Sequence, residues 1–137
     1  MPKGNLTLNR IIKSVEEDLS FALSQITKFN IRYPEDLRGW HVRASILLRK
    51  NDAAGLKHAC TQALQVDNSC VISRSLLGLA SALNGEYRTA SMELQRVCSI
   101  SPTDFYQIEL GTYLHLSGNT DAAFRRFISA KKLSENK

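Results

Sequence analysis

The stretch LLGLASALNGEYRTASMELQRVCSISP, residues 76–102, decides the fold. Apolar residues recur in it at helical spacing on both sides of a break at Asn84 and Gly85, and Pro102 closes it. Asparagine and glycine suit a tight turn, whereas proline cannot donate the hydrogen bond that would continue a helix. The stretch therefore predicts two helices joined by a short turn.

The same pattern recurs before and after this stretch. Residues 37–70 align with the residues that follow them at a shift of 34, and a further shift of 33 carries Gly78 and Gly85 onto Gly111 and Gly118. Because the glycines keep their place in a repeated two-helix pattern, we interpret them as packing and turn residues. No phosphate-binding sequence of the form G-x-x-x-x-G-K-[ST] is present.

The repeat resembles the tetratricopeptide repeat (TPR), a family of 34-residue helical hairpins. The second unit carries the family's residues at Leu77, Gly78, Gly85, Tyr87, Ala90 and Pro102. The third carries Leu110, Gly111, Gly118, Ala123 and Ala130 but lacks the proline. The first carries Trp40, Ala44, Leu56, Ala63 and Leu64, with Arg43 and Asn68 where leucine and proline are usual. A divergent hairpin precedes them, marked by Ala22, Ile26, Phe29 and Pro34.

The resemblance implies an all-α fold, a right-handed superhelical stack of antiparallel helix pairs of the TPR-like α-solenoid kind. We expect a single domain over residues 1–137. Its parts would be a divergent N-terminal hairpin at 5–34 and repeats at 37–70, 71–103 and 104–137. The small residues at 44, 78 and 111 would let the two helices of a hairpin approach closely.

The resemblance also implies that the first helix of each pair lines a concave groove, which receives an extended peptide or a helix. The groove positions of the family correspond here to Arg38, His41, Ser45, Leu48, Arg49, Ile72, Ser75, Leu79, Ala82, Leu83, Phe105, Ile108, Thr112, His115 and Leu116. This set is more apolar than a solvated wall requires, which favours a partner site. The alternative is that these residues bury one another or meet the N-terminal helix.

One subtype of the family clamps a C-terminal carboxylate with lysine, arginine and asparagine. The corresponding positions here hold His41, Ser45, Leu76, Phe105 and Glu109, so the clamp is absent. Glu109 would repel a carboxylate. The basic residues of the first unit, together with the apolar residues of the later units, suit an amphipathic or partly acidic segment.

Composition and motifs exclude several other functions. The net charge is +5, from 18 basic and 13 acidic residues, but no aromatic residues interleave with a basic strip, which disfavours nucleic acid. Cys60, Cys70 and Cys98 are an odd, widely spaced set, so we expect reduced thiols and no disulfide framework. The three histidines lack metal-ligand spacing, and no nucleophile elbow of the form G-x-S-x-G occurs.

We therefore expect no enzyme, no cofactor and no metal. The first residues form no signal peptide and no stretch is long enough to cross a bilayer, so the expected location is cytoplasmic. The leading hypothesis is a non-catalytic protein-interaction module, an adaptor or chaperone, that binds a peptide or amphipathic helix in its groove. The alternative is a repeat segment of a larger complex or enzyme, docking through its basic surface to an acidic partner or nucleic acid.

The C-terminal helix raises a further question about partners. Its apolar residues are many for a helix that ends an array: Phe124, Phe127, Ile128 and Leu133. Either a face stays open for another chain, including self-association with a second copy, or the sequence is a domain cut from a longer array.

Overall fold

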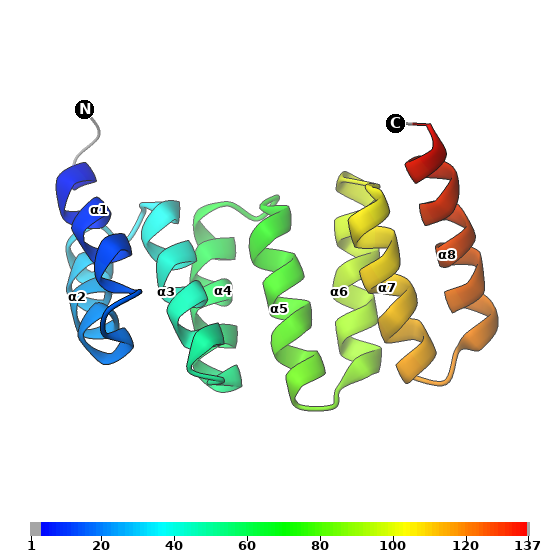
Figure 1. The fold of residues 1–137 in the computed structure, drawn as a ribbon, viewed down its shortest axis with the longest axis horizontal. Helices are drawn as coiled ribbons and strands as arrows, with labels where there is room; N and C mark the ends of the chain where they lie inside the picture. The colour runs from blue at the N-terminus through cyan, green and yellow to red at the C-terminus, as the bar shows by residue number, and fades with distance from the viewer. Residues whose placement is uncertain (1–3, 137) are drawn as a thin grey trace. The chain divides into compact units, whose positions relative to one another are not determined.

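The computed structural model describes residues 4–136, which form eight α-helices and no strand (Figure 1). The helices are α1 (Asn5–Ser14), α2 (Leu19–Arg32), α3 (Leu37–Arg49), α4 (Ala53–Val66), α5 (Val71–Leu83), α6 (Tyr87–Ile100), α7 (Asp104–Leu116) and α8 (Thr120–Glu135). The helices on either side of the quoted stretch's break are thus α5 and α6. The all-helical expectation is confirmed.

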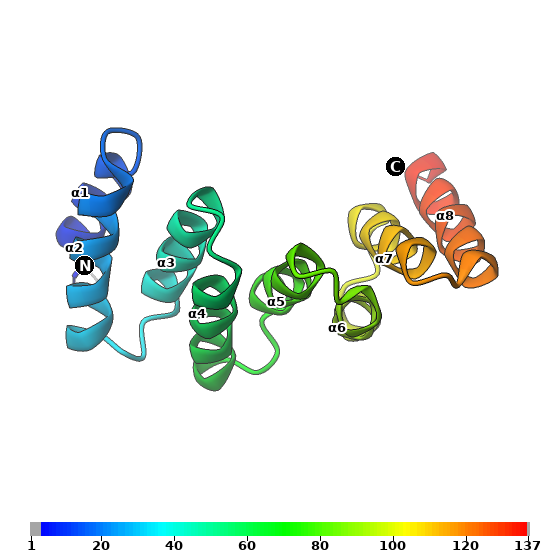
Figure 2. The same cartoon turned by 90° about the horizontal axis from the view of Figure 1, so that it is seen from below.

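The chain divides into two compact units, one ending at Asn68 and the other beginning at Ser69. Unit 1 contains α1 to α4, and unit 2 contains α5 to α8. Within each unit every helix packs against the next one along the chain. In unit 2, Figure 2 shows α6 between α5 and α7 and set to one side of them.

The turns inside the hairpins fall where the sequence predicts them. Asn51, Gly85 and Gly118 adopt positive φ angles of 57°, 76° and 92° between the paired helices. This left-handed region is open to glycine and tolerated by asparagine, so these residues reverse the chain at little cost. Asp52 and Asn119 then cap α4 and α8 by accepting hydrogen bonds from backbone N–H groups of their first turns.

Each unit has its own hydrophobic core. In unit 1 the core consists of Leu8, Ile11, Ala22, Ile26, Phe29 and Ile46. In unit 2 it consists of Ala90, Leu94, Val97, Cys98, Leu110, Tyr113, Leu114 and Ala123. The stripe expected for the N-terminal hairpin is therefore buried, and Cys60 and Cys98 are buried free thiols as expected.

Two glycines of unit 2 allow helices to touch. A Cβ added at Gly78 would lie 2.5 Å from Cδ2 of Leu94 on α6. A Cβ added at Gly111 would lie 2.5 Å from Cε1 of Phe127 on α8. Since carbon atoms in contact normally stay at least about 3.5 Å apart, a larger residue at either position would require the opposing side chain to move or the two helices to separate.

Candidate partner-binding surfaces

The predicted groove residues of unit 1 lie beside the N-terminal helix. His41, Ser45 and Arg49 of α3 line a cavity of about 300 Å³ together with Ile12, Val15, Glu16 and Val42. Arg49 Nη2 lies 3.1 Å from the Glu16 carboxylate, and both side chains are exposed. Burial lowers the pKa of His41, which favours its neutral imidazole. Leu48 is half-buried.

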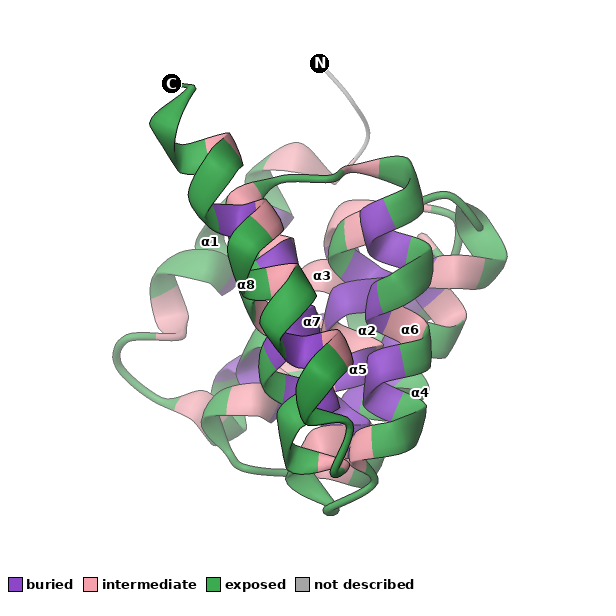
Figure 3. Ribbon diagram, turned by 90° about the vertical axis from the view of Figure 1, so that its right-hand side faces the viewer, coloured by how far each residue is buried: buried purple, intermediate pink, exposed green. Residues whose placement is uncertain are grey.

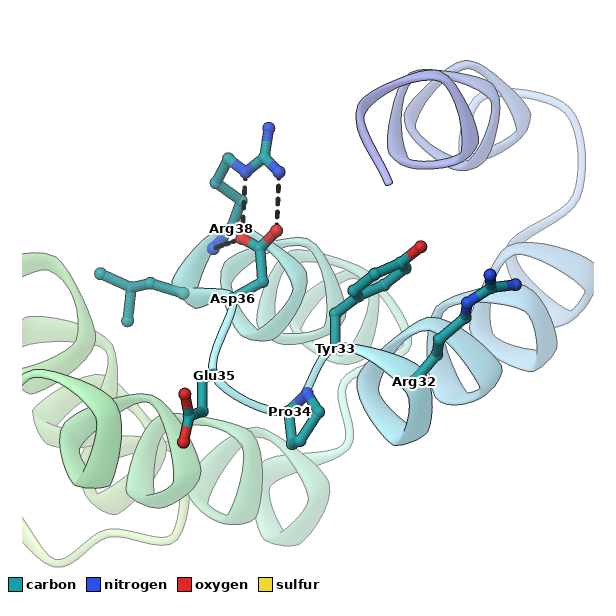
Figure 4. A pocket seen from close by; sticks show the side chains of 7 residues that line it. Arg32, Tyr33, Pro34, Glu35, Asp36 and Arg38 are labelled. Carbon is teal, nitrogen blue, oxygen red and sulfur yellow. Dashed lines mark hydrogen bonds and ion pairs between the residues drawn. The ribbon is translucent and has the colours of Figure 1, made fainter. Parts of the chain in front are cut away.

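Arg38, the remaining groove position of unit 1, is held by the connection between α2 and α3 (Figure 4). Its Nη2 lies 2.6 Å from Oδ2 of Asp36, and its Nη1 donates to Oδ1 of Asn5 at 2.9 Å. The hydrogen bond from the Arg38 guanidinium holds the pKa of Asp36 below its usual value. Residues 32–38 line a shallow pocket of about 770 Å³ here, and the charge of Arg38 is matched inside it.

Unit 2 presents large apolar side chains to the solvent on α5 and α7. Their exposed fractions lie between 44% and 67% for Ile72, Leu83, Phe105, Ile108 and Leu116. Residues three, four, seven and eleven apart share one face of a helix, so each set forms a row. We name this surface the α5–α7 face, made of Ile72, Leu79, Leu83, Phe105, Ile108, Thr112 and Leu116.

The other predicted groove residues of unit 2 contribute less to that face. Ser75 is buried, and its hydroxyl donates to the Glu109 carboxylate across the two helices. Ala82 packs against the core cluster of unit 2. Leu79 is half-buried, and His115 is exposed near the end of α7.

Glu109 lies where α5 and α7 meet. In the sequence it stands out only because it does not match the basic residue of the family's carboxylate clamp. Ser75 Oγ donates to Oε1 at 3.1 Å, and the Tyr113 hydroxyl lies 3.4 Å from the same oxygen. Burial raises the pKa of Glu109, because removal from water disfavours its charged form. Burial, with the neighbouring carboxylate, also raises the pKa of Tyr113. A shift of 33 residues aligns Ser75 with Ile108 and Leu76 with Glu109, so the repeat gives no signal for the contact between Ser75 and Glu109.

The last helix exposes a second apolar surface. Phe124 is 64% exposed and Phe127 and Ile128 about 40% each, although the Phe127 ring also packs over Gly111. Figure 3 shows exposed residues along the outward side of α8. Arg125 and Lys132 are exposed on the same helix, so the basic surface of the alternative hypothesis lies there as well.

Over residues 4–136, no group of three or more His, Cys, Asp or Glu side chains is placed to hold a metal ion. No helix in that range combines the length and the apolar character needed to cross a membrane.

Comparisons with known proteins bear on the fold. No family model matches the sequence, and no curated protein matches it either. Solved structures do match: a crystal structure of the MamA protein aligns at 18% identity with a TM-score of 0.83, covering 95% of this chain and 74% of that one. MamA from Desulfovibrio magneticus RS-1, beginning at position 41, aligns at 15% identity with a TM-score of 0.87, covering 96% and 75%. The MamA RS-1 ArsTM double mutant aligns at 15% identity with a TM-score of 0.89, covering 98% and 76%.

At such identities the match shows the fold alone. The chain has the all-helical, TPR-like helical-repeat fold of these structures. Because one fold hosts many functions, the function has to be argued from the surfaces described above.

Proposed function

We propose that this chain is a non-catalytic protein-interaction module that binds a peptide or an amphipathic helix on the α5–α7 face. The observation that carries the proposal is the exposure of five large apolar side chains on two helices that a hydrogen bond holds together. Large apolar side chains exposed together are typical of interaction sites. Stacked helical repeats form extended surfaces that suit protein interaction, which agrees with the proposal.

The spacing of the rows suggests how a partner would lie. Phe105, Ile108 and Leu116 follow one face of α7, and Ile72 and Leu83 follow one face of α5. A partner helix with apolar residues at every third or fourth position would bury both rows. Each half-exposed side chain would then contribute about 1 kcal/mol, before the cost of ordering the partner.

Unit 1 is a weaker candidate for the main contact. Its two arginines at groove positions are matched by carboxylates of the same unit, Arg38 by Asp36 and Arg49 by Glu16. An acidic partner would have to displace these contacts. We therefore assign the principal binding surface to unit 2, and interpret residues 71–103 and 104–137 as the two repeats that form it.

A selection from a random displayed peptide library tests the proposal with a defined probe. Peptides enriched by the wild-type chain should lose at least about tenfold in affinity when Phe105→Glu and Ile108→Glu are combined, because two charges would enter an apolar contact. Met92→Glu is the matched control, since Met92 is 54% exposed but lies on α6. Circular dichroism would confirm that all variants remain helical.

The same selection separates the alternative function. If the enriched peptides are acidic, survive the double variant of α7 and are lost with Arg125→Glu and Lys132→Glu, the basic surface of α8 is the docking site. A steep loss of affinity with salt would accompany that result, because exposed charge contacts are screened. Loss of these peptides with the α8 substitutions but not with the α7 substitutions would contradict a site on the α5–α7 face.

A further inference from the structure

We infer that the segment bound on the α5–α7 face carries a lysine or arginine side chain that pairs with Glu109. The inference rests on the proposed function and names the chemistry of the partner: an apolar segment interrupted by one basic residue.

The two partly buried glutamates of unit 2 differ in their partners. Glu93 on α6 has a side chain that is 15% exposed, and Arg74 Nη1 lies 3.0 Å from its Oε2. Arg96 lies 3.7 Å from its other oxygen. Over residues 4–136, the Glu109 carboxylate on α7 accepts side-chain hydrogen bonds from two hydroxyl groups and makes no ion pair. Since partly buried charges are normally paired, Glu109 lacks the cation that Glu93 has.

The chain's own cations near α7 are committed elsewhere. Arg74 points to Glu93, 3.0 Å away. Arg126 of α8 lies 3.5 Å from Oε1 of Gln107, a buried side chain on α7. Neither forms an ion pair with Glu109 among the residues that the structure describes, which leaves this carboxylate open to a cation supplied by a partner.

The position of Glu109 puts it between the two apolar rows. It follows Phe105 by one helical turn and is adjacent to Ile108, while Ser75 follows Ile72 by one turn on α5. The Ser75–Glu109 hydrogen bond therefore joins the rows near their middle. A partner covering both rows would place one of its own residues over this carboxylate.

The surroundings of Glu109 favour a cation over any neutral group. The hydroxyls of Ser75 and Tyr113 hold the carboxylate in place, so little freedom is lost when a partner binds. Partial burial weakens the screening by water, so a charge pair here is stronger than one on an open surface. The raised pKa of Glu109 agrees, because it reports a carboxylate whose desolvation no cation offsets.

The peptide selection tests this inference when it is repeated with Glu109→Gln. We expect the wild-type chain to enrich peptides with lysine or arginine at a fixed spacing from apolar residues, and Glu109→Gln to enrich the apolar pattern alone. A selected basic peptide should bind Glu109→Gln about tenfold more weakly. The peptide with glutamine in place of its basic residue should lose as much against the wild type, and little more against Glu109→Gln. Glu135→Gln is the matched control, because it removes the same charge from an exposed site on α8.

The outcomes separate the inference from the proposed function. Enriched peptides that depend on Phe105 and Ile108, but are equally basic with Glu109→Gln, would overturn the pairing and leave the binding face in place. Peptides that ignore the α7 substitutions altogether would overturn the proposed function. An unfolded Glu109→Gln chain is detected by circular dichroism, and Glu109→Asp, which keeps the charge but shortens the side chain, then serves as the second variant: it should retain the basic preference with reduced affinity, and loss of that preference would count against the pairing.

Discussion

Units 1 and 2 are built from the same helical hairpins but differ in the chemistry of their surfaces. Each is built from two packed hairpins with a core of its own. In unit 1 the arginines at groove positions are matched by neighbouring carboxylates, Arg38 by Asp36 and Arg49 by Glu16. Unit 2 leaves its apolar rows exposed, and over residues 4–136 no cation pairs with the Glu109 carboxylate between them. The repeated pattern therefore specifies the packing of helices, while the chemistry of each surface is set by residues that the packing does not constrain.

The largest effect on stability is expected at Gly78, the glycine that lets α5 and α6 touch. Gly78→Leu should lower the free energy of unfolding by about 1–3 kcal/mol or more, because the new side chain collides with Leu94. Urea unfolding would measure the loss, and hydrogen exchange should place it in unit 2. Gly85→Asn is the control: the turn has open space around it and asparagine tolerates its positive φ. An unchanged unfolding midpoint for Gly78→Leu would refute the close approach of α5 and α6.

A smaller effect is expected at Glu109, and its sign depends on pH. Because the pKa of this carboxyl is raised above its ordinary value of 4.5, the folded state binds the proton more tightly than the unfolded state. The contribution to stability is therefore full below pH 4.5 and is lost as the pH rises through the raised pKa. Glu109→Gln removes this dependence, since glutamine keeps an oxygen that can accept from Ser75.

Urea unfolding of both chains over a range of pH would check the sign. The stability of Glu109→Gln relative to the wild type should rise with pH, and at pH 7 the variant should be no less stable than the wild type. Such a result would mean that Glu109 is kept for something other than folding. If the variant is instead destabilised most at pH 7, the carboxylate serves the structure of unit 2, as the paired Glu93 does.

The smallest effect is expected in unit 1. Arg49→Gln removes the contact with Glu16, and both side chains are largely exposed, 47% and 75%. Exposed pairs contribute at most about 1 kcal/mol and are screened by salt. Unfolding at low and high salt should therefore show a small loss that disappears at high salt. A large or salt-independent loss would show that the charges of unit 1 do more than match each other.

The fold was predictable because its determinants are local. The period of the apolar residues, the turn residues at Gly85 and Gly118 and the terminating Pro102 act within a few residues, and the structure confirms the helices they predict. The close contacts of Gly78 and Gly111 followed from their recurrence in the repeat. These features can be predicted from the local sequence without knowledge of the tertiary contacts.

The binding face was only partly predictable for the opposite reason. Ile72 and Leu94 are both apolar residues at helical spacing, yet one is 52% exposed and the other fully buried. Periodicity identifies a face of a helix but does not say which neighbour covers it. Ser75 is predicted to line the groove, but it is buried, and its hydroxyl donates a hydrogen bond to Glu109 on α7. Whether a carboxylate is paired depends on such tertiary contacts, so the sequence could not predict that Glu109 forms no ion pair within residues 4–136.

The contact between Gly111 and the ring of Phe127 restricts how this chain can change over time. A side chain at position 111 would meet the Phe127 ring, so any substitution there requires that ring or α8 to move. Phe105 and Ile108, a few residues earlier on the same helix, are exposed, so substitutions there do not disturb the packing of the helices. Recognition can therefore be rewritten by surface substitutions alone, and a new partner acquired without a period of instability in the scaffold that carries it.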